Sequence, residues 1–440
     1  MPVAISLSVG FGLGIASWLL FIWLILFGSR NNIYVIIDFF VFVCFITAGL
    51  YFLYWKKQET WDSQISLNLI KKTNRFFHAT FWIALIISLT TFVLRSINNP
   101  HGGWDGWAIW NMRARFIFRG GEQWVNAFSN VINWSHPDYP LLIPLNITRI
   151  WRYLGLEAPI APISIAFLFT FSTVALLGSS ISYIHDHRHG ILASLVLLGI
   201  SAYFQLGSAQ YADVPLGFFI LATLILFFVK DKLPERSLQI IFMAGIMAGL
   251  AAWTKNEGLL FILCVVIVHL ITSVLITGLK TYKFEAAAFI SGILPSLLFI
   301  IYFKYQLAPP SSLLSGVQLT IERFTDSSRY LIIGKEYIIT SLDLLKYIII
   351  LFPLSFVLLG FSYPKRFNIG IKISIITLTL MNLGYIVIYL VSPYELDWHL
   401  DTSLERLILQ LLPSAIFLFF IFLSTPEDWQ TKRSFKSIIG

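Results

Sequence analysis

The chain has 440 residues, of which 57% are hydrophobic and only 12% are charged, and its formal net charge is +8. About a quarter of the residues in a soluble domain are charged, so this composition excludes an ordinary soluble protein. The apolar residues form runs long enough to cross a bilayer, which takes about 20 residues per helix. Lipid offers no partners to backbone groups, so spanning segments are helices or closed barrels, and runs of this length predict an all-α polytopic membrane protein.

Apolar runs in chain order predict about twelve transmembrane helices. They cover residues 6–27, 33–54, 76–94, 159–183, 191–206, 214–229, 237–253, 258–278, 286–303, 344–361, 370–391 and 406–424. The runs at 191–206 and 214–229 are short, so we expect tilted or partly re-entrant segments there. The sequence GFGLG at Gly10–Gly14 has no strand before it, which favours close helix packing over a phosphate-binding loop.

Basic residues are distributed unevenly between the segments that connect these runs. With both termini in the cytoplasm, the excess of Lys and Arg falls on the cytoplasmic segments, and the outer segments are balanced in charge. Membrane orientation therefore explains the positive net charge, and we expect no nucleic-acid partner. The same orientation places the segments richest in polar groups outside, the largest being the loop at 95–158.

This outer loop contains the stretch GGWDGWAIWNMRARFIFRGG at residues 102–121. From Trp104 to Arg119 the pattern predicts an amphipathic helix. Its polar side has Asn111, Arg115 and Arg119, and its apolar side has Trp107, Trp110, Ala114, Ile117 and Phe118. Such faces are typical of a helix lying flat at a membrane interface. Asp105 stands at its start, as an N-cap, as a catalytic carboxylate at the membrane surface, or as both.

Four further outer turns carry charged residues beside the membrane, where an ionisable group is costly without a role. They are SHPDYPLLIP at residues 135–144, QYADVPLGFF at 210–219, GLAAWTKNEGLLF at 249–261 and SPYELDWHLDTSLERLILQLLP at 392–413. Together with the early outer Asp, this ordered set resembles the GT-C superfamily of multipass glycosyltransferases, which use polyprenyl-phosphate sugars. The resemblance covers roughly residues 76–440.

The resemblance implies a GT-C-like transmembrane core at 76–440 with its catalytic outer loop at 95–158. The Asp-bearing loop of that superfamily usually follows the first span, whereas here it follows the third. We therefore expect residues 1–54 to form an additional N-terminal transmembrane hairpin, outside the catalytic cavity.

The implied activity is transfer of a sugar from a polyprenyl-phosphate carrier to an acceptor hydroxyl on a glycan, a lipid or a protein. The reaction would take place on the extracytoplasmic face, and we expect a bacterial cell membrane and a cell-envelope glycan. By resemblance Asp105 is the general base, and one direct displacement inverts the anomeric centre.

The leaving lipid phosphate requires cationic hydrogen-bond donors at the interface. The candidates are Arg406, Arg115, Arg119 and Lys255. Arg115 and Arg119 can instead extend to lipid headgroups. Glu405 can instead hold Arg406 in a structural ion pair.

Other polar residues of the outer turns are candidates for binding the sugar or the acceptor. They are His136, Asp138, Tyr139, Asp213, Glu257 and His399. Asp213 and Glu257 lie at helix starts and can equally be caps. Asp105, Asp138 and Asp213 can hold a divalent cation, but no spacing requires one, so we assign no metal ligand and no certain cofactor. The sequence HDHRHG at residues 185–190 looks metal-binding, but its cytoplasmic position favours a solvated turn.

A secondary transporter or a lipid-linked sugar flippase is the main alternative, since transporters also have about twelve spans with both termini in the cytoplasm. Transporters bind their substrates near the bilayer midplane, on broken helices. Here the ionisable residues cluster at the outer ends of the spans, and Asp38 is the only clear charge in mid-span. This distribution favours the transferase.

Overall fold

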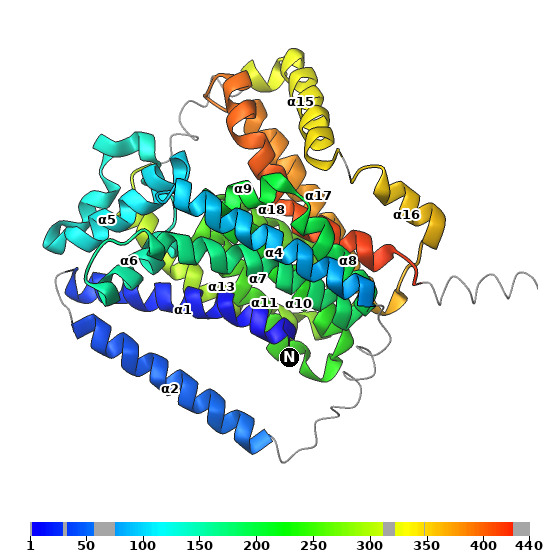
Figure 1. Cartoon of the computed structure of the whole chain (residues 1–440), viewed down its shortest axis with the longest axis horizontal. Helices are drawn as coiled ribbons and strands as arrows, with labels where there is room; N and C mark the ends of the chain where they lie inside the picture. The colour runs from blue at the N-terminus through cyan, green and yellow to red at the C-terminus, as the bar shows by residue number, and fades with distance from the viewer. Residues whose placement is uncertain (1, 30–32, 57–74, 311–321, 347, 426–440) are drawn as a thin grey trace, which may run out of the picture.

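The computed structural model describes residues 2–29, 33–56, 75–310, 322–346 and 348–425 (Figure 1). Within these residues the chain is helical, and its only strand-like feature is one isolated bridge between Phe361 and Leu423. Ten of the described helices are long and apolar enough to cross a membrane, and one bent pair of helices can add an eleventh span. The prediction of an all-α multi-pass membrane protein is confirmed for this part of the chain.

The helices follow one another closely. The first are α1 (Pro2–Phe27), α2 (Ile33–Lys56), α4 (Arg75–Asn98), the π-helical turn η1 (Gly106–Asn111), α5 (Met112–Arg119), the 3-10 helices η2 (Gly121–Phe128) and η3 (Asn130–Ser135), α6 (Leu142–Leu154) and α7 (Ile160–Ile184). Then come α8 (His187–Leu198), α9 (Ser201–Ser208), α10 (Asp213–Lys232), η4 (Pro234–Arg236), α11 (Ser237–Thr254), α12 (Glu257–Thr277) and α13 (Leu279–Gln306). The last are α15 (Ser327–Leu345), α16 (Leu351–Leu359), η6 (Lys365–Phe367), α17 (Asn368–Val391) and α18 (Leu396–Phe422).

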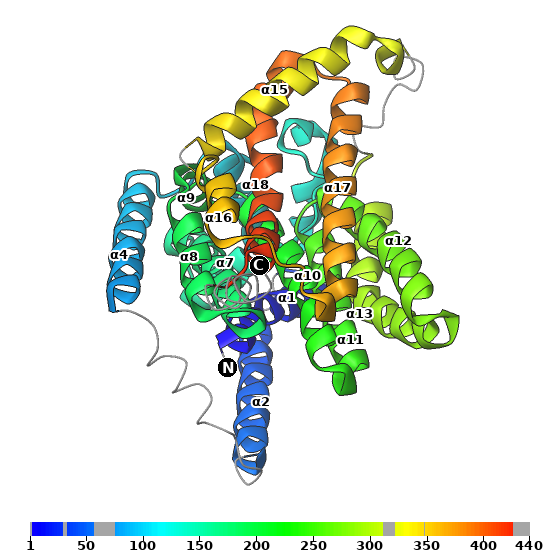
Figure 2. The ribbon, with the colours of Figure 1, turned by 90° about the vertical axis from the view of Figure 1, so that its right-hand side faces the viewer.

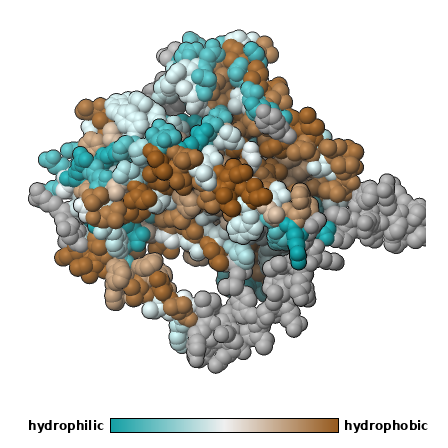
Figure 3. Space-filling view, in the orientation of Figure 1, coloured by the Kyte–Doolittle hydropathy of each residue, from teal (hydrophilic) through white to brown (hydrophobic). Residues whose placement is uncertain are grey.

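Helix α10 forms the centre of the bundle (Figure 2) and is buried along nearly its whole length. It packs against α7, α11, α17 and α18. A helix that is apolar on every side has no face for water, so burial among other helices is expected. By contrast α2 and α4 expose many large apolar side chains, which suits helices that face lipid. Figure 3 shows apolar residues over the region of α4, while hydrophilic residues gather over the regions of α5 and α15.

Helix α1 packs inside the bundle, against α6 and α7, with Leu20 and Phe21 fully buried. Its glycines permit this close approach. A Cβ atom at Gly10 would lie 2.5 Å from the Phe218 ring, and one at Gly14 would lie 2.4 Å from the Leu250 side chain. Small residues let membrane helices approach closely, so the packing interpretation of GFGLG is confirmed at these two glycines.

Asp38, the mid-span charge, joins α2 to α6. Its carboxylate accepts hydrogen bonds from the Tyr153 hydroxyl at 2.6 Å and the Tyr34 hydroxyl at 3.0 Å, and Arg149 Nη2 lies 2.8 Å away. A charge inside a membrane requires such partners. Asp38 therefore has structural partners on α2 and α6.

Two of the predicted spans are not single helices. The run at 344–361 was predicted as a span, but α15 ends at Leu345 and α16 has only nine residues. Nine residues cover about 13 Å, less than half of a bilayer core. The run at 191–206 falls on α8 and α9, which are bent by 66° relative to each other. The expected twelve spans are thus ten or eleven within the described chain.

Candidate active site

Asp105 stands in the first turn of a helix that continues through η1 and α5 to Arg119. Its side chain makes no capping hydrogen bond, so the N-cap interpretation was wrong. Instead, its Oδ2 accepts a short hydrogen bond from Nη2 of Arg406, which lies on α18. The π-helical turn that follows Asp105 is a rare element that occurs often at functional sites.

The helix Trp104–Arg119 has the expected extent but not the expected surroundings. Trp110, Ala114 and Ile117 of its apolar face are fully buried against protein, and so is Asn111 of its polar side. This apolar face was predicted to lie in the membrane interface. The correction is that most of it packs into the bundle, because the neighbouring α6 provides an apolar surface for it.

Glycines allow the backbone at the start of this helix to contact the turn between α9 and α10. The Gly103 amide donates to the Ala209 carbonyl at 3.0 Å. A Cβ atom at Gly102 or at Gly106 would lie 2.5 Å from that same carbonyl oxygen. Gly102 also has a positive φ of 77°, which L side chains rarely adopt. The sequence before and after Asp105 therefore needs glycine for the backbones to meet.

Arg406 also contacts Asp213, the first residue of α10. Its Nε and Nη2 atoms each lie 3.2 Å from Asp213 Oδ2. The other oxygen, Oδ1, accepts from Lys255 Nζ at 2.9 Å and from Gln410 Nε2 at 2.6 Å. Asp213 is thus engaged by cations and an amide rather than by its own helix start, and the alternative of a simple cap does not describe it.

Lys255 bridges two carboxylates. Its Nζ lies 2.9 Å from Asp213 and 2.7 Å from Glu257 Oε1. Burial acts to lower the pKa of Lys255, but these two carboxylates raise it well above its ordinary value. We call Asp105, Arg406, Asp213, Lys255 and Glu257 the ion network.

The ion network has a closed end and an open end. The side chains of Asp213 and Lys255, which form the closed end, are 0% and 4% exposed, whereas those of Asp105, Glu257 and Arg406 are 12%, 14% and 17% exposed. A ligand that approaches from solvent can therefore reach Glu257 and the pair of Asp105 and Arg406, which contact each other. At the closed end, Asp213 accepts hydrogen bonds from Arg406 and so holds its guanidinium in place.

Two tyrosines support this arrangement. The Tyr385 hydroxyl donates to Gln410 Oε1 at 2.7 Å and so orients the amide that binds Asp213. The Arg406 guanidinium carbon lies 4.7 Å from the centre of the Tyr211 ring, a cation–π contact. Burial and the nearby Asp105 carboxylate both raise the pKa of Tyr211.

The D-Y-P turn lies beside the network and is tied to two other elements. Asp138 Oδ2 accepts from Asn256 Nδ2 at 2.9 Å and from Lys304 Nζ at 3.3 Å. Asn256 directly precedes Glu257, so Asp138 is bound to the α11–α12 turn that carries Glu257.

Arg113 binds backbone carbonyls in and next to the D-Y-P turn. It is buried, and its guanidinium donates to the carbonyls of Tyr139 at 3.2 Å, His136 at 2.7 Å and Ser135 at 3.1 Å. Burial lowers the pKa of Arg113 to about 10. Desolvation of an arginine is costly without such partners.

Tyr139 is stacked between two rings, with centroid distances of 5.2 Å to His136 and 5.6 Å to Trp110. Burial raises its pKa, and the charge of Glu257 raises it further. Burial lowers the pKa of His136. The charges of Glu257, Lys255 and Arg406 all act on the pKa of Tyr139, so the D-Y-P turn lies near the ion network.

Arg115 and Arg119 lie apart from the ion network. Arg119 Nη2 lies 2.7 Å from Glu157 Oε2, and Arg115 Nε lies 3.4 Å from the same carboxylate oxygen. The His399 ring packs against Tyr389 and Tyr394, with centroid distances of 4.8 Å and 5.6 Å. The sequence placed these three in the site, and the structure assigns them other neighbours.

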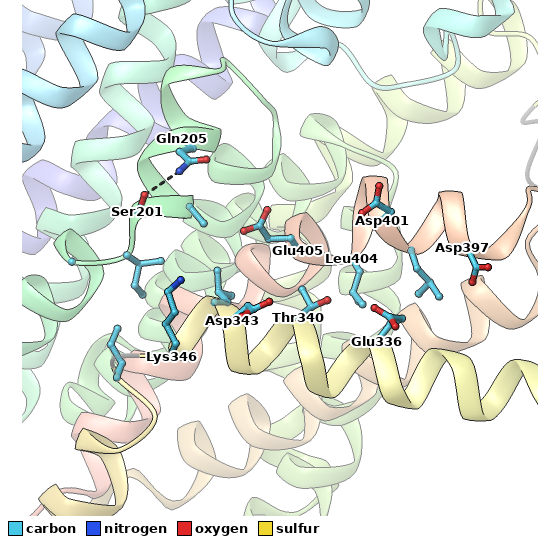
Figure 4. Close-up of a pocket in the computed structure, with 16 residues that line it drawn as sticks. Ser201, Gln205, Glu336, Thr340, Asp343, Lys346, Asp397, Asp401, Leu404 and Glu405 are labelled. Atoms are coloured by element: carbon cyan, nitrogen blue, oxygen red, sulfur yellow. Dashed lines mark hydrogen bonds between the residues drawn. The ribbon is translucent and has the colours of Figure 1, made fainter.

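A cavity of about 750 Å³ lies between α9, α15 and α18 (Figure 4), and none of the ion-network residues lines it. Its lining includes the side chains of Ser201, Gln205, Glu336, Thr340, Asp343, Lys346, Asp397, Asp401 and Glu405. Glu405 lines this cavity, and the ion pairs of Arg406 are with Asp105 and Asp213. The alternative of a Glu405–Arg406 pair is therefore corrected.

The described residues contain no group of three or more His, Cys, Asp or Glu side chains placed to hold a metal ion. In the sequence HDHRHG, Asp186 caps α8 by accepting from the amides of Arg188 and His189. His185 Nε2 lies 2.8 Å from the Leu423 carbonyl. These residues thus have local structural roles.

Six residues at the site were not predicted from the sequence: Gln410, Tyr385, Tyr211, Asn256, Lys304 and Arg113. Gln410 had a usable signal, because it is a polar residue four positions after Arg406 within an apolar run and so shares its helix face. Lys304 likewise is the one basic residue near the end of its span. The other four are ordinary loop or helix residues by pattern alone.

Comparisons with protein-family models, curated proteins and solved structures give no significant match.

Proposed function

We propose that this protein is a membrane glycosyltransferase that moves a sugar from a polyprenyl-phosphate carrier to an acceptor hydroxyl. One observation supports this most strongly. Asp105 and Arg406 come from distant parts of the chain and meet at the open end of a buried ion network. A carboxylate and a guanidinium at one opening are the two groups that this chemistry needs.

Asp105 is the proposed general base. It takes the proton of the acceptor hydroxyl while that oxygen forms a bond to the anomeric carbon of the sugar. The bond from the anomeric carbon to the phosphate oxygen breaks, and its electron pair stays on that oxygen. The products are the glycosylated acceptor, with the anomeric centre inverted, and the polyprenyl phosphate.

Arg406 is the proposed donor for the phosphate. Its Nη1 atom has no hydrogen-bond partner among the described residues, while Nε and Nη2 hold it to Asp213. A planar guanidinium can engage two phosphate oxygens at once. The donor is a phosphodiester with one negative charge, and the product is a monoester with more charge. Arg406 therefore binds more strongly as the reaction proceeds.

Lys255, Arg115 and Arg119 are weaker choices for the phosphate than Arg406. Lys255 is buried between Asp213 and Glu257, and the two arginines share Glu157. The cavity of Figure 4 is also a poor phosphate site, because five carboxylates line it against one lysine. Its many hydrogen-bond acceptors suit the hydroxyl groups of a sugar acceptor instead.

The distribution of Lys and Arg and the GT-C resemblance support an extracytoplasmic position for this site, and we propose a bacterial cell membrane. The polyprenyl chain would then lie in the bilayer while its phosphate reaches Arg406 at the start of the last span. The acceptor would be a glycan, lipid or protein of the cell envelope.

The test is release of polyprenyl phosphate from a panel of short-chain polyprenyl-phosphate hexoses and pentoses by the purified protein in detergent. We expect Asp105→Asn to lower release by at least about 100-fold, the lower range for loss of a general base. Its folding should persist, since Asp105 caps no helix. Glu157→Gln, a carboxylate outside the ion network, should retain activity. Normal turnover by Asp105→Asn would remove the base assignment.

A cation-coupled transporter or lipid-linked sugar flippase is the second candidate, and one observation favours it. The bend between α8 and α9 lies at the acidic cavity, which Gly199, Ile200 and Ser201 help to line. Transporters bind ions and substrates at such broken helices. Uptake of a labelled lipid-linked sugar into proteoliposomes, without release of polyprenyl phosphate, would support this candidate over the transferase.

A further inference from the structure

We propose that the donor phosphate displaces Asp105 from Arg406, so that the base becomes free only when the donor is bound. The inference rests on the proposed function and adds a control step to the same site. It follows from how differently Arg406 holds its two carboxylates.

Asp105 is bound at one point only. Among the described residues, its carboxylate accepts a single hydrogen bond, from Arg406 Nη2. Its side chain is 12% exposed. When the hydrogen bond from Arg406 breaks, Asp105 remains at the open end, where water and an acceptor hydroxyl can reach it.

Asp213 is bound from two sides and stays in place. Besides Arg406, it accepts from Lys255 and Gln410, and its side chain is fully buried. Arg406 in turn keeps two nitrogen atoms on Asp213 when Asp105 departs. The exchange therefore breaks only the ion pair between Asp105 and Arg406. The contacts of Asp213 stay in place.

Charge gives the exchange its direction. The ion network contains three carboxylates and two cations, so it is already net negative. A phosphate that enters beside Asp105 meets repulsion unless the carboxylate moves away from Arg406. A phosphate oxygen also replaces the carboxylate oxygen as a charged acceptor for the same guanidinium.

The exchange matters because, in the resting site, Arg406 Nη2 occupies Oδ2 of Asp105, so this oxygen is not available to the acceptor hydroxyl. With the phosphate on Arg406, Asp105 is free to take the acceptor proton, and the sugar–phosphate bond breaks with its electron pair leaving on the phosphate. When the lipid phosphate departs and Asp105 loses its proton to water, the pair with Arg406 forms again. This order protects the donor from base-assisted hydrolysis before it is seated.

The test compares binding of farnesyl phosphate to the purified full-length protein and to variants, in detergent, by calorimetry. Farnesol and inorganic phosphate are the control ligands, and thermal unfolding is recorded for each protein. We expect Asp105→Asn to bind farnesyl phosphate about three- to tenfold more tightly than the wild type, because the competing anion is gone. Asp105→Glu keeps the anion and should show no gain, and Glu157→Gln should match the wild type.

If Asp105→Asn folds poorly, Asp105→Ala replaces it, since it also removes the anion. Equal or weaker farnesyl phosphate affinity in the folded neutral variant overturns the displacement while leaving the proposed transfer unaffected. A wild type that binds farnesyl phosphate no better than farnesol or inorganic phosphate overturns the proposed donor, and with it the displacement.

Discussion

Asn111 and Gln210 are joined side chain to side chain, with Asn111 Nδ2 2.7 Å from Gln210 Oε1. The Asn111 amide also donates to the His101 carbonyl, and the Gln210 amide donates to the Pro100 carbonyl, each at 3.0 Å. Gln210 has a positive φ of 63°, which is uncommon outside glycine. These contacts hold the loop that carries Asp105 against the turn before α10, and so they help to set the distance between Asp105 and Asp213.

Asn111→Leu should break the hydrogen bonds between the loop that carries Asp105 and the turn before α10. It leaves the buried Gln210 oxygen and the His101 carbonyl without their donor, which costs about 1–3 kcal/mol for each unsatisfied buried group. We expect a lower midpoint of thermal unfolding in detergent and lower transfer activity. Asn126→Leu is the control, because Asn126 is exposed on η2 and its side chain has no hydrogen bond among the described residues. Equal stability of the two variants would contradict the role of Asn111.

Gly106→Ala should disturb Asp105 through the backbone. Its new Cβ atom would lie 2.5 Å from the Ala209 carbonyl oxygen, so either the helix start or the turn must move. We expect a loss of transfer activity of at least about tenfold, because a misplacement of about 1 Å at a reacting group can cost about 100-fold. Gly12→Ala is the matched control, since a Cβ there has nothing within 4 Å. Its stability should be unchanged or up to about 1 kcal/mol higher. Full activity of Gly106→Ala would show that the contact yields without moving Asp105.

Arg406→Lys keeps the positive charge but loses the planar fork. A lysine cannot hold Asp213 and a phosphate through several parallel bonds, so affinity for farnesyl phosphate should fall by roughly 1–3 kcal/mol. Stability should change little, because Lys255 and Gln410 still hold Asp213. Calorimetry and thermal unfolding of the same preparation separate the two effects. Arg236→Lys, on the exposed η4 turn, should change neither. Unchanged affinity together with a large loss of stability would make Arg406 a structural residue only.

Lys255→Met should chiefly destabilise the fold. Lys255 is buried between Asp213 and Glu257, and its removal leaves Glu257 without its cation and the fully buried Asp213 with Arg406 alone, at a cost of about 3–5 kcal/mol. Thermal unfolding should show the loss even without ligand. Lys280→Met tests the loss of an exposed lysine and should be close to neutral. A stable Lys255→Met protein with weakened farnesyl phosphate binding would return Lys255 to the donor site.

His136 should make stability depend on pH in one direction. Burial lowers its pKa from the ordinary value of 6.5, so the unfolded chain binds a proton at a higher pH than the folded protein. Stability is therefore greatest above about pH 6.5 and falls as the pH drops below that value. His136→Asn removes this titration and tolerates the positive φ of 49° at this position. Its unfolding midpoint should fall less between about pH 7 and pH 5.5 than that of the wild type. An equal fall in both proteins would assign the dependence to other groups.

Most of the helices long enough to cross a membrane could be predicted from the sequence, and so could the positions of the ionisable residues at their ends. Both are local properties: a run of about 20 apolar residues is a span wherever it packs, and an ionisable residue at a span end stands out from its neighbours. The run at 344–361 shows the limit, since apolar composition cannot reveal that the backbone ceases to be helical after Leu345. The sequence also brought Asp105, Asp213, Lys255, Glu257 and Arg406 into one region, through their order along the chain.

Which of these groups are in contact depends on the tertiary structure. Asp105 and Arg406 are 301 positions apart, and their contact depends on how α18 packs against α10. The same is true of Gln410 on Asp213 and of the pairing of Arg115 and Arg119 with Glu157. The apolar face of the helix Trp104–Arg119 is equally suited to lipid and to protein, so its pattern could not tell which it meets. Charge and hydrophobicity specify that a group needs a partner, but the distance between two groups is set by the packing of the helices that carry them.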